Sequence, residues 1–256
     1  MNGKAKLTGT ERQIWSAGFL VFLILFWQLL SMLVGKNFLL PSPLAVLRSL
    51  WTHRAEIFLV HFPATLEVII LGGILAVLTG ILFAVLMDLS PWMKSALYPI
   101  LTVSQTIPVM CLAPVLVLWF GYTVRMRVLV VILVNFFTVT VNLYDGFAAA
   151  NPGRLELMRT YGADRMQIFS LLKMPTALPY FLTALRISVP WSVIGAAVAE
   201  WLGAQNGLGT YSRSCMMNLD AAGLLAPLVV LTAFALFLNW VLGLAERRLA
   251  GWQDMS

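Results

Sequence analysis

The sequence predicts an all-α, polytopic membrane helix bundle with about six transmembrane helices. Hydrophobic residues make up 60% of the 256 positions and charged residues only 11%, whereas a soluble domain carries about 25% charged residues. The apolar residues form long uncharged runs, and most lysines and arginines lie between these runs, as in the loops of membrane proteins. An apolar surplus arranged in this way has to lie in lipid.

The first apolar run, residues 14–34, is long enough to cross a bilayer. It contains no charged residue, and about 20 helical residues span the hydrocarbon core. A cleaved signal peptide has a shorter apolar core of about 7–15 residues, so we expect a retained first helix. Further runs follow at 63–87, 96–120, 128–141, 180–202 and 223–244.

Residues 42–61 predict an amphipathic helix on the outer membrane surface. Ser42 followed by Pro43 is a typical helix start. Both histidines, His53 and His61, belong to this segment, and no third ligand accompanies them, so we expect no metal site. The apolar positions share one side of the helix: Leu44, Leu47, Trp51 and Phe58.

The distribution of lysine and arginine predicts that both termini are cytoplasmic. With the N-terminus inside, the inner segments hold ten of these residues and the outer segments six. Residues 142–179 then form the longest polar stretch on the cytoplasmic side. Their amphipathic pattern is interrupted at Gly162, which predicts two short helices joined in a compact knob to which a partner docks.

Several kinds of chemistry are missing from the sequence. The Gly-Lys pairs at 3–4 and 35–36 are not followed by Ser or Thr, so the phosphate-binding loop of ATPases is not present. No catalytic residue is assigned, because a nucleophile needs a base within reach and both histidines lie in one segment. The sequence has no basic stripe interleaved with exposed aromatic residues, so it does not suggest nucleic-acid binding. We therefore do not expect an enzyme.

Rows of small residues predict close helix packing in two of the spans, because small side chains let helix backbones approach each other. Proline inside the third span, at Pro108 and Pro114, predicts a kink there. One row lies in the second span and the other in the fifth: Gly72, Ala76, Gly80 and Ala84, and Ala184, Ser188, Ser192 and Ala196.

Residues 156–175 resemble the loop that marks the membrane subunits of ABC importers. The family pattern is E-A-A, three residues, G, nine residues and I-x-L-P. This chain has Glu156-Leu157-Met158, then Gly162, then 172–175 ending in Pro175. The glutamate, glycine and proline fall at the family spacing, whereas both alanines, the isoleucine and the leucine are replaced.

Other motifs are similar to those of the nitrate, sulfonate and taurine group of importer permeases. They are Trp119-Phe120-Gly121, Ala177-Leu178-Pro179 and the run 200–209, which ends in Gly-Leu-Gly. Within this group, residues 104–108, 141–146 and 200–204 look most like permeases for pyrimidine precursors of thiamin. The resemblance covers the chain from Pro41 onward.

The resemblance implies a type I ABC importer transmembrane-domain fold, with residues 1–256 as one domain and residues 63–244 as the permease core. A second permease chain, expected to be a copy of this one, would complete the channel. Two ATPase subunits would bind ATP and Mg on their own residues and dock on the coupling loop 142–179, so this chain would hold no cofactor. A periplasmic or lipid-anchored binding protein would deliver the solute to the bacterial inner membrane.

The resemblance also implies which residues contact the ATPase. Gly162 would form the turn, and Arg159, Asp164 and Arg165 would pair with charges of the partner. The expected coupling residues are Glu156, Arg159, Gly162, Ala163, Asp164, Arg165 and Pro175. The polar or aromatic residues expected along the substrate pathway are Gln105, Asn135, Trp191 and Glu200. Packing explains Trp191 equally well, and Asn135 could instead bridge helices.

These inferences predict import of a small solute by alternating access, driven by ATP hydrolysis on the partner subunits. A pyrimidine precursor of thiamin leads, ahead of sulfonates, nitrate and riboflavin. A secondary carrier that works without an ATPase is the competing hypothesis, supported by polar groups in the spans. A membrane scaffold would explain the small-residue rows but not the coupling loop.

Overall fold

The computed structural model describes residues 9–36 and 38–249, and the regular structure of this part is helical throughout. Five of its helical runs are long and apolar enough to cross a membrane. They are Trp15–Val34, Arg54–Leu89, Val124–Ala148, Arg165–Gly203 and Ala221–Arg247. A sixth span results if the bent pair α5 (Pro91–Thr106) and α6 (Val109–Phe120) is counted as one. The prediction of an all-α bundle with about six spans is confirmed.

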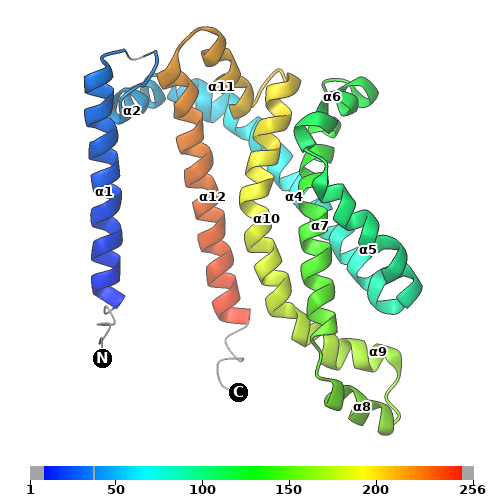
Figure 1. Cartoon of the computed structure of the whole chain (residues 1–256). Helices are drawn as coiled ribbons and strands as arrows, with labels where there is room; N and C mark the ends of the chain where they lie inside the picture. Colours follow the sequence, from blue (N-terminus) through cyan, green and yellow to red (C-terminus); the bar gives the residue numbers. More distant parts are fainter. Residues whose placement is uncertain (1–8, 37, 250–256) are drawn as a thin grey trace.

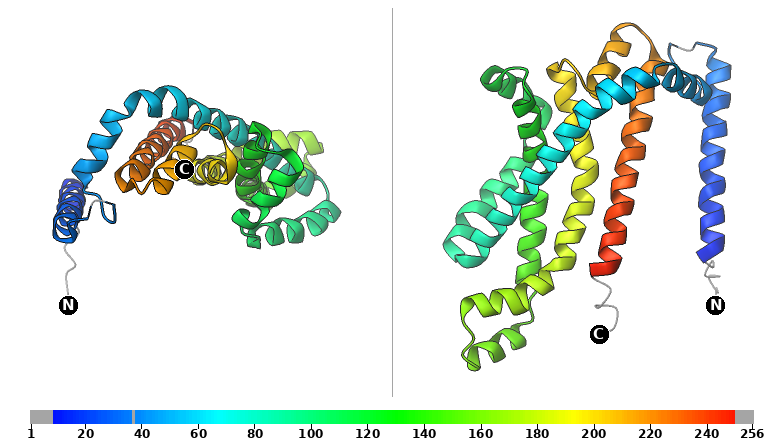
Figure 2. Two further views of the ribbon diagram at one scale, coloured as in Figure 1. Left: turned by 90° about the horizontal axis from the view of Figure 1, so that it is seen from above. Right: turned by 180° about the vertical axis from the view of Figure 1, so that it is seen from behind.

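The first span stands apart from the others. Helix α1 (Gly9–Val34) is joined through residues 35–42 to the short helix α2 (Pro43–Thr52), and Figure 1 shows it beside the bundle rather than inside it. Seen from above, the molecule is elongated, with α1 at one end and the α5–α6 pair at the other (Figure 2). Nearly all apolar side chains of α1 are exposed, as expected of a helix that lies in lipid.

The predicted amphipathic helix at 42–61 is shorter than expected. Ser42 caps α2 by accepting the N–H of Ala45 at 3.1 Å, as the Ser-Pro signature predicts. The helix breaks at His53, and the residues that follow belong to the second span. They form α3 (Arg54–Glu56) and the π-helical turn η1 (Ile57–His61), which continue into α4 (Phe62–Leu89). His61 therefore lies in the second span and not in a surface helix.

The predicted third span, 96–120, is two helices rather than one. Helices α5 and α6 meet at an angle of 99°. Pro108 cannot donate a backbone hydrogen bond and disfavours the helical conformation of the residue before it. Ile107 and Pro108 accordingly have extended ψ angles of 117° and 121°. The expected kink at Pro108 is thus a complete break.

Three long helices form the centre of the bundle. The small residues of α4 pack on α7 (Val124–Ala148), and α10 (Met174–Gly203) packs on both α7 and α4. A Cβ placed on Gly72 would lie 2.6 Å from Cβ of Val131, and one on Gly80 would lie 2.7 Å from Cβ of Val139. Both rows of small residues are buried, and the contacts of Gly72 and Gly80 show that the row of α4 serves the close packing predicted for it.

The polar segment predicted at 142–179 begins later than expected, because α7 extends to Ala148. Asn142 satisfies its amide within the helix by donating to the carbonyl of Thr138 at 2.8 Å. Gly146 lets α10 approach, since a Cβ there would lie 2.8 Å from Cα of Ala177. Residues 142–148 are therefore part of the bundle, and the segment outside it is short.

The rest of the chain consists of short helices and the last span. Beyond α7 the chain forms α8 (Pro152–Thr160), α9 (Arg165–Ile168) and the π-helical turn η2 (Phe169–Lys173), which leads into α10. Helix α11 (Leu208–Met217) and the last span α12 (Ala221–Leu249) follow. Helices α8 and α9 lie at the same end of the bundle as the first residues of α1 and the last residues of α12, whereas α2, α6 and α11 lie at the opposite end (Figure 1).

Candidate functional site

Helices α8 and α9 form a compact hairpin, which we call the α8–α9 hairpin (residues 152–168). Its turn depends on Gly162, whose φ of +77° favours glycine. The N–H of Gly162 donates to the carbonyl of Arg159 at 3.0 Å, and that of Ala163 to the carbonyl of Met158 at 2.9 Å. This is the Schellman ending of a helix. The predicted pair of short helices meeting at Gly162 is confirmed.

Side chains within the hairpin fix both helix starts. Asp164 accepts the N–H of Gln167 at 2.7 Å, and Gln167 Oε1 accepts the N–H of Asp164 at 2.9 Å. This reciprocal pair is a capping box. Asn151 caps α8 by accepting the N–H of Arg154 at 3.1 Å. The shape of the hairpin is therefore determined by its own residues and by Asn151, which directly precedes it.

The expected coupling residues lie together on the α8–α9 hairpin, except for Pro175, which is half-buried in the first turn of α10. Ala163 is half-buried, and the others are exposed: Glu156, Arg159, Gly162, Asp164 and Arg165. Large apolar side chains are exposed among them: Leu157, Tyr161 and Met166. An exposed surface of apolar, aromatic and arginine side chains is typical of protein interaction sites.

The hairpin is tied to three of the long helices. Lys173 in η2 forms an ion pair of 2.5 Å with Asp88 near the end of α4. The ring of Phe169 lies 5.2 Å from that of Phe147 in α7. Helix α9 continues through η2 into α10 as one helical run, Arg165–Gly203. The hairpin is therefore connected through η2 to α4, α7 and α10.

At the opposite end of the bundle, side chains of two spans hold the start of α11. The first N–H groups of a helix have no partner within the helix. Here three consecutive groups are accepted by side chains of η1, α4 and α10: Gly207 by His61 Nδ1 (3.1 Å), Leu208 by Thr65 Oγ1 (2.8 Å) and Gly209 by Glu200 Oε2 (2.8 Å). We call this arrangement the α11 clamp.

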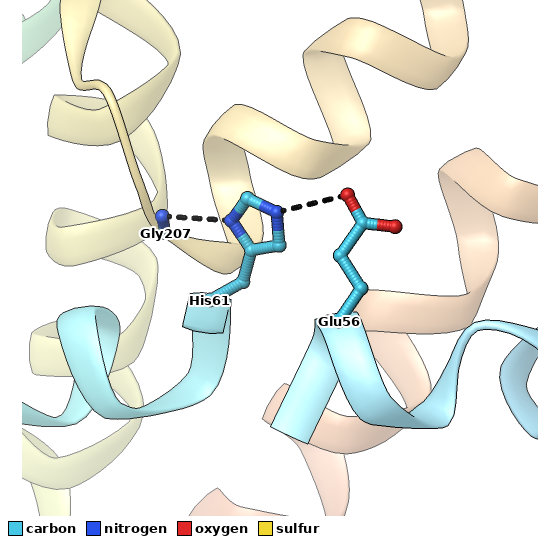
Figure 3. Close-up of polar contacts among 3 residues, drawn as sticks. All are labelled: Glu56, His61 and Gly207. Atoms are coloured by element: carbon cyan, nitrogen blue, oxygen red, sulfur yellow. Dashed lines mark hydrogen bonds and ion pairs between the residues drawn. The ribbon is translucent and has the colours of Figure 1, made fainter. Parts of the chain in front are cut away.

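The hydrogen bond from Gly207 fixes the tautomer of His61 (Figure 3). Because Nδ1 accepts the N–H of Gly207, the ring proton of a neutral His61 is on Nε2. Nε2 lies 3.6 Å from Oε1 of Glu56. His61 thus connects a carboxylate of α3 to the loop before α11.

The glycines of the run 207–209 are explained by their approach to Glu200, which is fully buried. A Cβ on Gly207 would lie 2.3 Å from Cδ of Glu200, and one on Gly209 would lie 2.5 Å from the carbonyl oxygen of Ala197. Arg127 donates to the carbonyl of Asn206 at 3.3 Å and further fixes the loop.

A cleft of about 380 Å³ lies in the middle of the bundle, between α4, α10 and α12. Most of its lining is aliphatic. Its polar lining comes from Asn135 of α7 and from Ser188 and Ser192 of α10. The cleft lies at the depth of the apolar spans, between the α8–α9 hairpin and the α11 clamp.

The four residues expected along a substrate pathway lie in different places. Asn135 lines the cleft. Gln105 is exposed in the last turn of α5, and Trp191 is 49% exposed on α10 outside the lining of the cleft. Glu200 belongs to the α11 clamp. The structure therefore does not bring these four side chains together.

Sequence reasoning missed several residues of these sites. His61 and Thr65 are four residues apart and thus share a helix face, a spacing that could have drawn attention to them. Ser188 was assigned to helix packing, although a hydroxyl in an apolar span is also a candidate ligand. Asp88 and Lys173 flank two apolar runs with opposite charges, which is the signal that could have paired them.

Comparison with known proteins defines the class. Residues 76–251 match the family described as the inner membrane component of binding-protein-dependent transport systems. The chain belongs to this family, and it is a multi-pass permease subunit of an ABC importer.

The relatives are similar over most of their length. The chain is 44% identical to the formylaminopyrimidine transport permease protein ThiX of Halalkalibacterium halodurans, covering 84% of this chain and 86% of the relative. It is 31% identical to the taurine transport system permease protein TauC of Escherichia coli, covering 91% and 86%. The predicted membership of the importer permeases, with formylaminopyrimidine and taurine permeases among the relatives, is confirmed.

The fold is similar to that of a solved importer. The match to the MetNI methionine ABC transporter in an inward-facing conformation has a TM-score of 0.65 at 18% identity, and covers 82% of this chain and 98% of that chain. This confirms the transmembrane-domain fold of type I ABC importers. A permease of this family is not itself an enzyme, and its transport depends on a binding protein.

Proposed function

We propose that this permease subunit imports a pyrimidine precursor of thiamin. The observation that carries the proposal is the 44% identity to a formylaminopyrimidine permease over 214 residues, against 31% to the taurine permease. The cleft agrees with this choice, since the described residues that line it carry no charge that would pair with a sulfonate.

The α8–α9 hairpin is the proposed docking site for the ATPase subunit. Its exposed side chains combine both signs of charge with large apolar groups, and its turn is rigidly capped. Arg159, Asp164 and Arg165 would pair with charges of the partner, and Tyr161 and Met166 would enter an apolar depression. ATP and Mg would be held by the partner alone.

The assembled transporter would contain two copies of this chain, two ATPase subunits and one binding protein on the outer side. The end of the bundle with the α8–α9 hairpin would lie in the cytoplasm, together with both termini. The end with the α11 clamp would face the loaded binding protein. This orientation agrees with the excess of lysine and arginine on the hairpin side.

Transport would proceed by alternating access. ATP binding would draw the two hairpins together and favour the outward-open state, and hydrolysis would reverse the change. A ligand shifts such an equilibrium only by its different affinity for the two states. The connections of the hairpin to α4, α7 and α10 would carry this motion into the bundle.

The experiment that tests this function begins with copurification of the tagged chain in mild detergent. An ATPase subunit and a binding protein should accompany it, and the complex in liposomes should take up radiolabelled formylaminopyrimidine only with ATP. Taurine serves as the competing solute. Uptake of taurine instead of formylaminopyrimidine would show that the proposed substrate is wrong. Uptake of solute by the chain alone without ATP would favour a secondary carrier.

A further inference from the structure

The cleft between α4, α10 and α12 contains polar oxygens whose hydrogen-bonding capacity is unused. Asn135 is 1% exposed and Ser188 is 6% exposed. Neither Oδ1 of Asn135 nor Oγ of Ser188 has a hydrogen-bond partner in the described part of the chain. Buried polar groups are nearly always hydrogen-bonded, so each exception needs an explanation. Both residues line the same cleft.

The orientation of the Asn135 amide is fixed by its own helix. Its second amide atom lies 2.8 Å from the carbonyl oxygen of Val131. A carbonyl can only accept, so the NH₂ group faces Val131 and Oδ1 is left as an acceptor. Ser188 offers a hydroxyl that can donate or accept. Two residues that line the cleft therefore hold one acceptor and one hydroxyl, both unpaired and buried just beneath its surface.

The rest of the cleft is shaped for a small apolar body. Apart from Ser192, whose hydroxyl donates to the carbonyl of Ser188 at 2.9 Å, the rest of its described lining is aliphatic and carries no charged side chain. Gly73 leaves part of the wall open, because a Cβ there would meet only Ser192 Oγ, at 3.8 Å. The volume of about 380 Å³ is near the lower end of the roughly 300–1,000 Å³ typical of small-molecule sites.

We infer that this cleft is a binding site within the membrane domain for a small uncharged solute. The ligand would donate an N–H to Asn135 Oδ1 and accept a hydrogen bond from the Ser188 hydroxyl on a neighbouring atom, and its flat apolar body would lie against α4 and α12. An amino-substituted heteroaromatic ring has this pattern. A sulfonate does not, because a buried anion without a partner is strongly disfavoured.

The inference rests on the proposed function and deepens it, since it names residues that would recognise the imported pyrimidine after the binding protein releases it. A lipid chain could fill the apolar part of the cleft but could not hydrogen-bond to Asn135. A trapped water could donate a hydrogen bond to Asn135, and a binding measurement with the labelled solute distinguishes the two.

The test measures equilibrium binding of radiolabelled formylaminopyrimidine to the permease–ATPase complex in lipid nanodiscs, without binding protein. Asn135→Leu removes the acceptor and keeps the volume. Asn142→Leu is the matched control, because Asn142 lies about two turns along the same helix, makes the same amide bond to the carbonyl four residues earlier, and does not line the cleft.

We expect Asn135→Leu to weaken binding at least tenfold while the melting temperature stays the same or rises, because an unpaired buried acceptor is replaced by an apolar group. Asn142→Leu should leave the affinity unchanged, and Ser188→Ala should weaken binding several-fold. Taurine should not compete. A structural role of Asn135 would instead lower the melting temperature.

Equal affinities of wild type, Asn135→Leu and Ser188→Ala would overturn the inference, and so would absence of binding in a wild-type complex that imports formylaminopyrimidine with ATP. In both cases the proposed function would stand. If Asn135→Leu proved unstable, Ser188→Ala alone would decide, and unchanged binding in it would also overturn the inference. Absence of ATP-driven uptake of formylaminopyrimidine would refute the proposed substrate itself.

Discussion

Glu200 accepts the backbone N–H of Gly209 at 2.8 Å, although the carboxyl group is fully buried in the apolar bundle. Glu200 lies in the last turn of α10, and Gly209 lies in the first turn of α11. The hydrogen bond therefore closes the connection between α10 and α11. His61 and Thr65 hold the two preceding N–H groups, so the second span is joined to the same point.

Glu200→Ala should destabilise the protein, because the N–H of Gly209 would be left buried and unpaired. The expected loss is about 1–3 kcal/mol of unfolding free energy. The measurement is thermal or denaturant unfolding of the purified protein in detergent. Glu67→Ala is the control, since Glu67 is exposed on α4, and should change stability by less than about 0.5 kcal/mol. Equal effects of the two substitutions would contradict the α11 clamp.

Gly72→Ala should destabilise the packing of α4 on α7. The new Cβ would lie 2.6 Å from Cβ of Val131, and overpacking of this kind costs about 1–3 kcal/mol. Gly195→Ala tests the same valine from α10, at an ordinary contact distance of 3.6 Å. It should be neutral or slightly stabilising, because alanine favours helices over glycine. Melting temperatures in one detergent would compare the two variants.

Gly162→Pro should abolish ATPase binding while the bundle remains folded. Proline requires φ near −65° and has no N–H, whereas Gly162 has φ of +77° and donates to Arg159. Gly162→Asn is the matched variant, because asparagine tolerates positive φ, and it should retain most of the binding. Copurification of the ATPase reports docking, and the melting temperature reports folding. Normal transport by Gly162→Pro would show that the ATPase does not dock on this turn.

Glu156→Arg tests the charges of the same hairpin. Glu156 is exposed, so the substitution should leave the fold unchanged and weaken the partner contact. We expect ATP hydrolysis that no longer drives uptake. Arg154→Glu also alters a charge at an exposed position, near the start of α8, so the coupling of ATP hydrolysis to uptake can be compared between the two variants. Full uptake in Glu156→Arg would exclude this carboxylate from the coupling surface.

The ion pair between Asp88 and Lys173 should contribute more than that between Arg186 and Glu246. The first pair is mostly buried, with side-chain exposures of 11% and 22%, whereas the second has 44% and 28%. Exposed pairs contribute about 0–1 kcal/mol because solvent screens them. Double-mutant cycles with Asp88→Asn and Lys173→Gln, and with Glu246→Gln and Arg186→Gln, would measure both interaction energies. A larger value for the second pair would refute this ranking.

The sequence was informative wherever a local pattern is sufficient. The capping signals at Ser42 and Gly162 predicted helix boundaries that the structure confirms, because a cap involves residues only a few positions apart. The small residues of α4 predicted close packing, and their four-residue spacing placed them on one helix face. These predictions required no knowledge of the partner helix.

Predictions failed where the outcome depends on distant residues. The second span includes residues 54–61, where His61 accepts the N–H of Gly207, and α7 includes residues 142–148, where Gly146 packs against Ala177 of α10. The bend of 99° between α5 and α6 exceeds the kink that a proline by itself suggests. The sequence predicted a surface helix for residues 54–61 and a polar segment outside the spans for residues 142–148, whereas the structure continues the second span and α7 through them.

The sequence by itself determined the membrane class, the number of spans, the hairpin at Gly162 and the family of the chain, because hydropathy, helix caps and short motifs are local properties. Only the tertiary structure decided which polar side chains meet. It placed Glu200 with Gly209 in the α11 clamp, Asp88 with Lys173 beside the hairpin, and Asn135 with Ser188 in the cleft. Such pairs come from separate helices, and their distances depend on how those helices pack.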